Sequence, residues 1–458
     1  MLVAAAAELV GVPPAGPVPL ASVGCALLLS WRVWATARGP LGLSAGASLM
    51  GVAFLALSPA IAAWSSSGLE TMPAALLLFL TFEALFLWKR ADAWAWGALL
   101  AVGVSLIRAE GFTWALLLSA VSRHRLRTLP LVGLAVAAQF GLRKLYFGQW
   151  VPNTVTAKVG FSAPVLARGL RYFASVQLTL LTPLLALAGS ATLLRRLPDR
   201  IAQVGAGLLL LGGLCWPVLV GGDFMPMGRL FVSVLPFLAL AWAAGLASAP
   251  RPAQLVAVGA LLLGVLPAFD LHLVPEPARA ALNYRLGKPY RSEHRAWEME
   301  RDQVTVLRTV GRALKAHTPP GATVVAGAIG VLGYESDREI LDRYGLVTPE
   351  VARREIVPSA LGMPGHDKAV EVFYFAKDQP DVLFAAMMPN DALQERTRPF
   401  ARDLFKRGLQ SQYAPALLPH EGQWLFVLRR IRAGEDPAVV WEAYTEAVGM
   451  EGAVQRGG

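Results

Sequence analysis

The chain has 458 residues, of which 55% are hydrophobic and 16% are charged, and its mean hydropathy is +0.48. Soluble domains contain about 25% charged residues, so this composition excludes an ordinary soluble protein. The formal net charge is +10, but residues 1–274 contain 18 Lys or Arg against 8 Asp or Glu, whereas residues 275–458 contain 24 of each. The basic excess therefore lies in the apolar part, where it is typical of cytoplasmic loops, and a nucleic-acid partner is not expected.

Cysteine and histidine indicate no cofactor site. Cys25 and Cys215 both lie in apolar runs, and none of the six histidines forms a His-x-x-x-His pair. We therefore expect no disulfide framework, no metal ion and no cofactor.

Apolar segments follow one another from residue 18 to residue 268. A membrane-spanning helix needs about 20 mainly apolar residues. Residues 93–122 are interrupted by Arg108-Ala109-Glu110-Gly111, which predicts a helical hairpin with two short arms. The other predicted spans are residues 18–37, 41–63, 72–88, 128–145, 174–194, 201–220, 230–248 and 252–268.

The charges of the connections predict an orientation. Alternate connections are basic, with only Asp92 and Asp199 opposing, and should face the cytoplasm. The basic set is Arg38; Lys89 and Arg90; Arg123, Arg125 and Arg127; Arg195, Arg196 and Arg200; and Arg251. The other connections, residues 64–71, 108–111, 145–171, 221–229 and everything after 268, should then face outward.

A second domain begins where the hydropathy falls. Residues 292–315 form a charged amphipathic pattern, residues 322–328, 381–385 and 424–428 are β-capable runs, and helical patterns cover 390–409 and 437–448. The predicted fold is a polytopic α-helical membrane domain, residues 1–270, followed by an extracytoplasmic α/β domain, residues 271–458.

Polar residues gather in the four short outward connections. Each has a structural alternative: Glu70 suits the start of a helix, Arg108 and Glu110 could simply pair, and Gly221-Gly222 could be only a turn. Taken together, they indicate a site at the membrane interface. Cations there suit a lipid phosphate, carboxylates could orient sugar hydroxyls or act as a base, and Trp64 and Trp150 could stack on sugars. The candidate cations are Arg143, Lys144, Lys158 and Arg229, and the candidate carboxylates are Glu70 and Asp223.

Several motifs carry a family resemblance. They are Ser67-Gly68-Leu69-Glu70-Thr71, Arg108-Ala109-Glu110-Gly111, Pro152-Asn153-Thr154 with Ala157-Lys158, Gly221-Gly222-Asp223-Phe224-Met225 with Arg229 and Leu235-Pro236, Asp342-Arg343-Tyr344-Gly345-Leu346, and Pro364-Gly365-His366-Asp367-Lys368. In this order the chain resembles the GT-C integral-membrane glycosyltransferases related to the actinobacterial terminal β-(1→2) arabinofuranosyltransferase.

The resemblance implies transfer of a monosaccharide, arabinofuranose being the best-known one, from a polyprenyl-phosphate donor. The acceptor would be a cell-envelope glycan or protein outside the bacterial plasma membrane. It also implies binding roles for Glu70, Arg108, Glu110, Asn153, Thr154, Lys158, Asp223 and Arg229.

The beginning of the chain departs from the family pattern. The family opens with a span and an Asp-Asp loop that carries its catalytic aspartate, and residues 1–17 match neither. We expect the gene to start upstream of Met1; otherwise Asp223 is the substitute base. The second position of the Arg-Ala-Glu-Gly motif is usually proline in the family. Here it is Ala109, which puts the geometry of the hairpin in question.

Three residues of the second domain are further candidates. Asp342, His366 and Lys368 either contact the acceptor glycan or the membrane domain, or hold loops together, and we favour the loop role. Two other functions stay open: a transporter or flippase for a lipid-linked sugar, and a non-catalytic membrane scaffold.

Overall fold

The computed structural model describes all residues except 1, 159, 161, 357–360, 390–392 and 449–458. The chain forms two compact units, the first made of residues 1–297 with 357–367 and the second of residues 298–356 with 368–458. The first unit thus extends beyond the predicted boundary at residue 270. It also includes the later segment that contains His366, although the sequence analysis assigns this histidine to the second domain.

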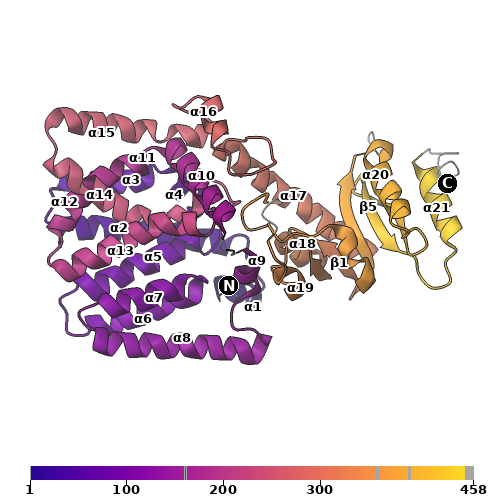
Figure 1. Cartoon of the computed structure of the whole chain (residues 1–458), viewed down its shortest axis with the longest axis horizontal. Helices are drawn as coiled ribbons and strands as arrows, with labels where there is room; N and C mark the ends of the chain where they lie inside the picture. The colour runs from indigo at the N-terminus through magenta and orange to yellow at the C-terminus, as the bar shows by residue number, and fades with distance from the viewer. Residues whose placement is uncertain (1, 159, 161, 357–360, 390–392, 449–458) are drawn as a thin grey trace. The chain divides into compact units, whose positions relative to one another are not determined.

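The first unit is helical in every region where a span was predicted (Figure 1). The hairpin of residues 93–122 is confirmed, with its break at residues 108–110. The elements are α1 (Leu2–Leu9), α2 (Pro17–Arg38), α3 (Ala45–Ala56), α4 (Pro59–Ser65), α5 (Thr71–Phe82), the π-helical η1 (Glu83–Leu87), α6 (Ala93–Ile107), α7 (Gly111–Val121), α8 (Arg125–Phe147), α9 (Asn153–Lys158), α10 (Ala163–Leu180), α11 (Thr182–Ala186), η2 (Leu187–Gly189), α12 (Ser190–Arg196), α13 (Arg200–Leu219), η3 (Arg229–Phe231), α14 (Leu235–Ser248), α15 (Arg251–Leu263), η4 (Leu266–Phe269), α16 (Glu276–Ala281) and the beginning of α17 (Glu293–His317).

Three helices in the described part of the chain are long and apolar enough to cross a membrane: residues 17–38, 200–219 and 251–269. Two bent helix pairs bring the number to five if each pair is one span. The pairs bend by 60° between α3 and α4 and by 92° after α10. The predicted spans 41–63 and 174–194 therefore correspond to bent helix pairs. Pro59 and Pro183 each follow a break, because proline opens a helix readily and cannot continue one.

The core of the first unit surrounds α14. Eleven of its residues are buried, and it packs against α2, α3, α11 and α12. Close approach depends on glycine: a Cβ atom on Gly189 would lie 1.9 Å from the carbonyl oxygen of Ala241. The sequence of α14 is apolar on all sides because no face of the helix is exposed to solvent.

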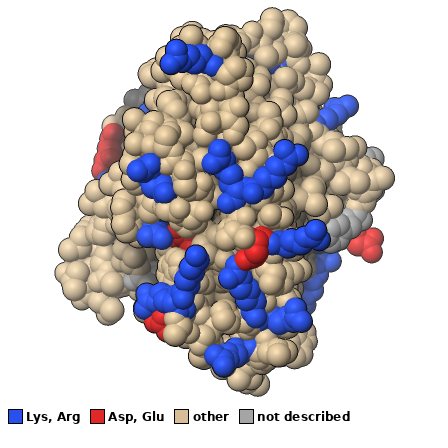
Figure 2. Space-filling view, turned by 90° about the vertical axis from the view of Figure 1, so that its left-hand side faces the viewer, with Lys and Arg blue, Asp and Glu red and all other residues tan. Residues whose placement is uncertain are grey.

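The basic connections meet at one side of the first unit. Arg123 forms an ion pair with Asp199, Arg196 donates a 3.4 Å hydrogen bond to Ser248, and the Arg127 guanidinium lies 5.5 Å from the Trp94 ring centre. Figure 2 views this side, where α12 ends, and shows Lys and Arg far outnumbering Asp and Glu. The alternation of charge along the sequence therefore corresponds to a physical face.

The second unit contains a five-stranded mixed sheet in the order β2-β1-β3-β5-β4. β1 pairs in parallel with β2 and β3, and β5 pairs antiparallel with β3 and β4. The three predicted strands are confirmed as β1, β3 and β5, whereas β2 and β4 were not predicted. The strands are β1 (Thr323–Ala326), β2 (Glu339–Asp342), β3 (Val382–Met388), β4 (Tyr413–His420) and β5 (Gln423–Arg430), and the helices besides α17 are α18 (Ile329–Ser336), α19 (Pro349–Ala352), η6 (Val372–Asp378), α20 (Leu393–Lys406) and α21 (Pro437–Ala447).

The contact at Gly189 gives a test of the packing around α14. We expect Gly189→Ala to lower the free energy of unfolding by about 1–3 kcal/mol, because the added methyl group has no space. The measurement is thermal unfolding of the detergent-purified protein. Gly207→Ala in α13 is the control, since a Cβ there meets nothing within 4 Å, and it should be neutral or slightly stabilising. Equal unfolding temperatures for the two variants would contradict this packing.

Candidate functional site

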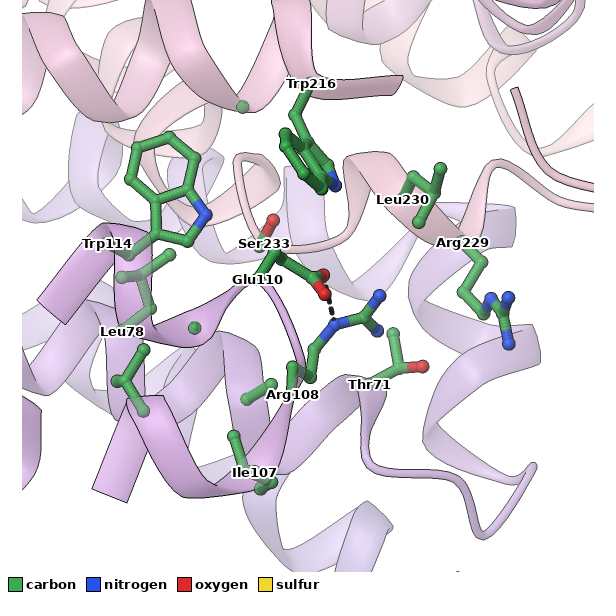
Figure 3. Close-up of a pocket in the computed structure, with 14 residues that line it drawn as sticks. Thr71, Leu78, Ile107, Arg108, Glu110, Trp114, Trp216, Arg229, Leu230 and Ser233 are labelled. Carbon is green, nitrogen blue, oxygen red and sulfur yellow. Dashed lines mark hydrogen bonds and ion pairs between the residues drawn. The ribbon is translucent and has the colours of Figure 1, made fainter. Parts of the chain in front are cut away.

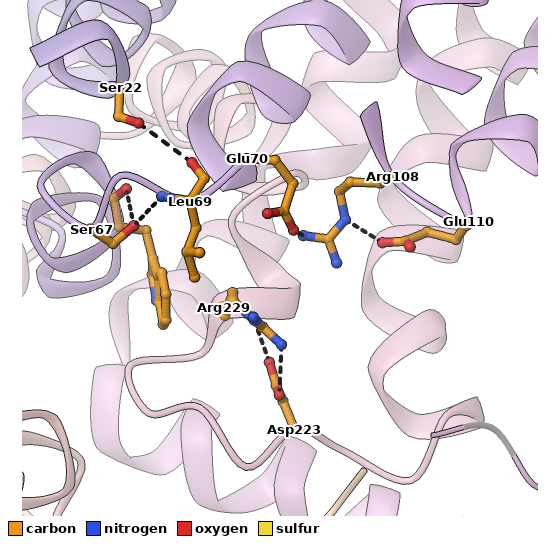
Figure 4. Close-up of polar contacts among 9 residues, drawn as sticks. Ser22, Ser67, Leu69, Glu70, Arg108, Glu110, Asp223 and Arg229 are labelled. Atoms are coloured by element: carbon orange, nitrogen blue, oxygen red, sulfur yellow. Dashed lines mark hydrogen bonds and ion pairs between the residues drawn. The ribbon is translucent and has the colours of Figure 1, made fainter. Parts of the chain in front are cut away.

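The four polar connections of the first unit come together around one cavity. Arg108 donates to Glu110 at 2.5 Å and to Glu70 at 3.4 Å, which joins the connection before α5 to the break between α6 and α7. Arg229 donates to both carboxylate oxygens of Asp223, at 2.7 and 2.9 Å. Figure 4 shows these two groups of ion pairs side by side.

Two contacts between a cation and an aromatic ring connect further residues of these connections. The Arg229 guanidinium lies 5.6 Å from the centre of the Trp64 ring, and the Lys158 ammonium lies 5.8 Å from the centre of the Phe224 ring. Trp64 is fully buried, so its predicted role in stacking on a sugar does not fit; it packs within the protein instead.

The main cavity has a volume of about 490 Å³ and a lining of two sets of side chains, called here its charged wall and its apolar wall. Its charged wall consists of Glu70, Arg108, Glu110, Lys158, Asp223 and Arg229. Its apolar wall includes Phe112, Phe140, Val151, Val155, Trp216 and Leu230. A small cavity of about 30 Å³, shown in Figure 3, shares Arg108, Glu110 and Arg229 with it and continues toward Trp114.

Glycines shape the backbone at two edges of the cavity. Gly221 and Gly222 both have positive φ, 78° and 89°, and turn the chain sharply after α13 so that Asp223 follows at the cavity wall. A Cβ on Gly111 would lie 1.9 Å from the carbonyl oxygen of Val104, so only glycine allows the two arms of the hairpin to approach this closely. The hairpin thus forms with Ala109 in place of the expected proline.

Lys158 differs from the two arginines in its electrostatics. Both arginines are in ion pairs with carboxylates, whereas Lys158 makes no ion pair with any of the described residues. Burial lowers the pKa of the Lys158 amine from its ordinary value, and the nearby Arg229 charge lowers it further. Among the described residues no carboxylate therefore lies within ion-pair distance of Lys158, although the charges of Asp223 and Glu70 act against the lowering of its pKa.

Asp223 is held in place by its partners. Its side chain is 5% exposed, Arg229 binds both of its oxygens, and the backbone N–H of Met225 donates to Oδ1 at 3.3 Å. As the predicted substitute base, the carboxylate would accept a proton either beside its two hydrogen bonds to Arg229 or after exchanging them.

Seven of the eight predicted binding residues line the main cavity, and Asn153 does not. Asn153 begins α9, whose later residues Thr154 and Lys158 reach the wall. The predicted phosphate cations Arg143 and Lys144 lie near the end of α8, also outside the lining, and Lys144 donates to the carbonyl of Gly148 at 2.9 Å. Trp150 is 60% exposed beside Lys144, a position typical of a membrane-interface anchor.

The three candidates from the second domain have separate positions. Asp342 is fully buried and accepts backbone N–H bonds from Tyr344, Leu346 and Val347, so it holds the turn after β2. Lys368 donates to the carbonyl of Ala352 at 3.0 Å within the second unit. Both contacts favour the loop-holding interpretation.

His366 is the exception, because it belongs to the first unit. Its ring lies 4.3 Å from that of Phe224, centre to centre. Burial, and next the Lys158 charge, lower its pKa to about 4, so the imidazole is neutral at physiological pH.

Sequence reasoning missed parts of the wall. Pro364 and Gly365 line the cavity although they are far from its other residues in sequence, and Asp367 pairs with Arg168 across 199 residues. The apolar wall was missed as well, because its aromatic residues do not differ from other span residues in the sequence. In the described ranges, no group of three or more His, Cys, Asp or Glu side chains could hold a metal ion, and the two cysteines are unpaired.

Comparisons with known proteins give one family match. Residues 293–440 match a domain of unknown function, DUF8728. No curated protein and no solved structure matches the chain. The match begins at α17, includes Pro364–Asp367 and ends at residue 440, so it covers most of the second unit together with part of the cavity lining.

Proposed function

We propose that the chain is a membrane glycosyltransferase that moves a monosaccharide, with arabinofuranose as the candidate sugar, from a polyprenyl-phosphate donor to a cell-envelope glycan or protein. The reaction would take place at the extracytoplasmic face of a bacterial plasma membrane, with the polar loops and the second unit on that side. The observation that carries the proposal is Lys158, which has no carboxylate within ion-pair distance among the described residues, in a cavity lined by both charged and apolar side chains.

The two walls match the two ends of such a donor. A lipid phosphodiester has one negative charge next to a long apolar chain. Lys158 could pair with that charge, and Phe112, Phe140 and Val155 could contact the first isoprene units. A water-soluble nucleotide sugar would not use the apolar wall.

The ion pairs suggest how the charges respond to a ligand. Arginine binds phosphate bidentately, so Arg229 could exchange one or both hydrogen bonds to Asp223 for phosphate oxygens. This exchange would free the Asp223 carboxylate to orient the sugar or to accept the proton of the acceptor hydroxyl. In the transfer the bond between C1 of the sugar and the phosphate oxygen breaks, its electron pair stays on the phosphate, and the acceptor oxygen bonds to C1.

The arrangement of the basic connections supports the orientation. They form one face, and the cavity is built by the other set of connections. With the basic face on the cytoplasmic side, as proposed, the cavity would open on the outer side, where a lipid-linked donor rather than a nucleotide sugar is the expected substrate class.

The first test is donor binding. The probe is farnesyl methyl phosphate, a lipid phosphodiester with a constant single charge, titrated calorimetrically into the detergent-purified chain. We expect Lys158→Ala to weaken binding about 10- to 100-fold, as expected for loss of a charge-assisted bond of about 1.5–3 kcal/mol. Lys144→Ala is the control, because that lysine lies outside the cavity lining. Unchanged affinity in Lys158→Ala would remove the phosphate site from the proposal.

Transfer itself is tested with farnesyl-phosphoryl-arabinofuranose and an arabinan oligosaccharide, with product detected by mass spectrometry. Product formation that Asp223→Asn reduces at least about tenfold supports the enzyme. If the donor binds but is carried unchanged across a vesicle membrane, the protein is a transporter, and the glycosyltransferase proposal is wrong.

A pH profile gives an independent test. The pKa of Lys158 is lowered, so the fraction of its charged form, and with it the affinity for the phosphodiester, should be greatest below that pKa and fall as the pH rises through it. Lys158→Arg should abolish the fall, because a guanidinium remains charged throughout. The measurement is the dissociation constant of farnesyl methyl phosphate from pH 6 to about pH 11, which extends past the ordinary pKa of a lysine amine. A profile that is flat for the wild type would contradict the role of Lys158.

A further inference from the structure

The most deeply buried ion pair beside the cavity joins residues from distant parts of the first unit. Arg168 on α10 donates to both carboxylate oxygens of Asp367, at 2.6 and 2.7 Å, and each side chain is 1% exposed. The third contact of the guanidinium is a 3.0 Å hydrogen bond from Nε to the carbonyl of Gly221. None of these atoms belongs to the cavity lining.

Asp367 ends a short turn that forms part of the cavity wall. The N–H of His366 donates to the carbonyl of Met363 at 3.1 Å, and Gly365 has a φ of +78°. A Cβ atom on Gly365 would lie 3.4 Å from Cγ of Lys158, so the turn lies directly against the lysine stem. The position of this turn therefore limits where the Lys158 ammonium can go.

The other contact of Arg168 holds a second segment beside the cavity. Gly221 immediately precedes Gly222 and Asp223, and a Cβ on Gly221 would lie 3.1 Å from Nη2 of Arg168. Phe224 in the same loop packs on His366 and lies under the Lys158 ammonium. One guanidinium thus touches both segments that enclose Lys158.

We propose that Arg168 and Asp367 are positioning residues, which fix the Met363–Asp367 turn and the Gly221–Asp223 loop so that Lys158 and Asp223 meet the phosphate and the sugar of one donor. The inference rests on the proposed function for the identity of the ligand, but its geometric part can be tested without one. Buried ion pairs are often no more stabilising than apolar side chains of similar volume, so stability alone is a poor reason for this pair.

The experiment compares Asp367→Asn with Asp367→Glu and Arg168→Lys. Glu83→Gln is the matched control, because Glu83 also forms a buried bidentate pair, with Arg32 at 2.9 and 2.9 Å, but outside the cavity lining. The first readout needs no ligand: acetylation of Lys158 relative to Lys144 by a water-soluble amine reagent, quantified by mass spectrometry. The second readout is the affinity for farnesyl methyl phosphate.

We expect Asp367→Asn to raise the relative acetylation of Lys158 several-fold and to weaken lipid-phosphate binding about 10- to 100-fold, the effect of a misplacement near 1 Å. Asp367→Glu should restore part of the normal acetylation of Lys158 and part of the affinity, and Arg168→Lys should resemble Asp367→Asn. Glu83→Gln should change neither the acetylation nor the affinity, even if it lowers the unfolding temperature as much as Asp367→Asn does.

Unchanged Lys158 acetylation in Asp367→Asn overturns the inference, whatever happens to binding. Equal effects of Glu83→Gln also overturn it, because they would mean that the pair only stabilises the fold. If acetylation changes as expected but the wild type does not bind the phosphodiester, the positioning role stands and the proposed function fails.

Discussion

A charge in an apolar interior is costly unless an opposite charge or a full set of hydrogen bonds compensates it, and this constraint organises the first unit. Arg32 with Glu83, Arg168 with Asp367 and Arg229 with Asp223 are all bidentate pairs whose carboxylate is buried. Lys158 stands among these pairs without a carboxylate of its own within ion-pair distance in the described residues. Lys158 thus differs from the other two cations of the cavity lining, Arg108 and Arg229, which are both in ion pairs with carboxylates.

The sequence was sufficient for the helices, the hairpin break and the two charge-sorted faces, because these follow from hydropathy and from the sign of charges in short connections. It did not predict the bends. At Leu181 the backbone has a positive φ of 52°, which nothing in a leucine-rich run indicates. The strand β2 (Glu339–Asp342) was missed because it is four residues long and lacks an alternating pattern.

The site could be predicted only in part, for a similar reason. The predicted orientation assigns Glu70, Arg108 and Asp223 to connections on one side, and in the structure all three residues line one cavity. Asp367, in contrast, lies in a polar stretch that resembles any solvent-exposed loop. Its burial depends on Arg168, 199 residues earlier, and no local pattern indicates a pair at that separation. The match to DUF8728 is not confined to the second unit. It contains Glu293, a residue of the first unit whose carboxylate accepts a hydrogen bond from the N–H of Met227, in the loop between Asp223 and Arg229.

The basic face has a further consequence in an energised membrane. Moving one elementary charge across a potential of 100 mV changes the free energy by about 2.3 kcal/mol. The connections that meet at this face contain ten Lys and Arg residues against Asp92 and Asp199. In the predicted orientation, with this face in the cytoplasm, turning the unit over would carry those charges against the field and also through hydrocarbon. The membrane potential would then oppose inversion of the helical unit.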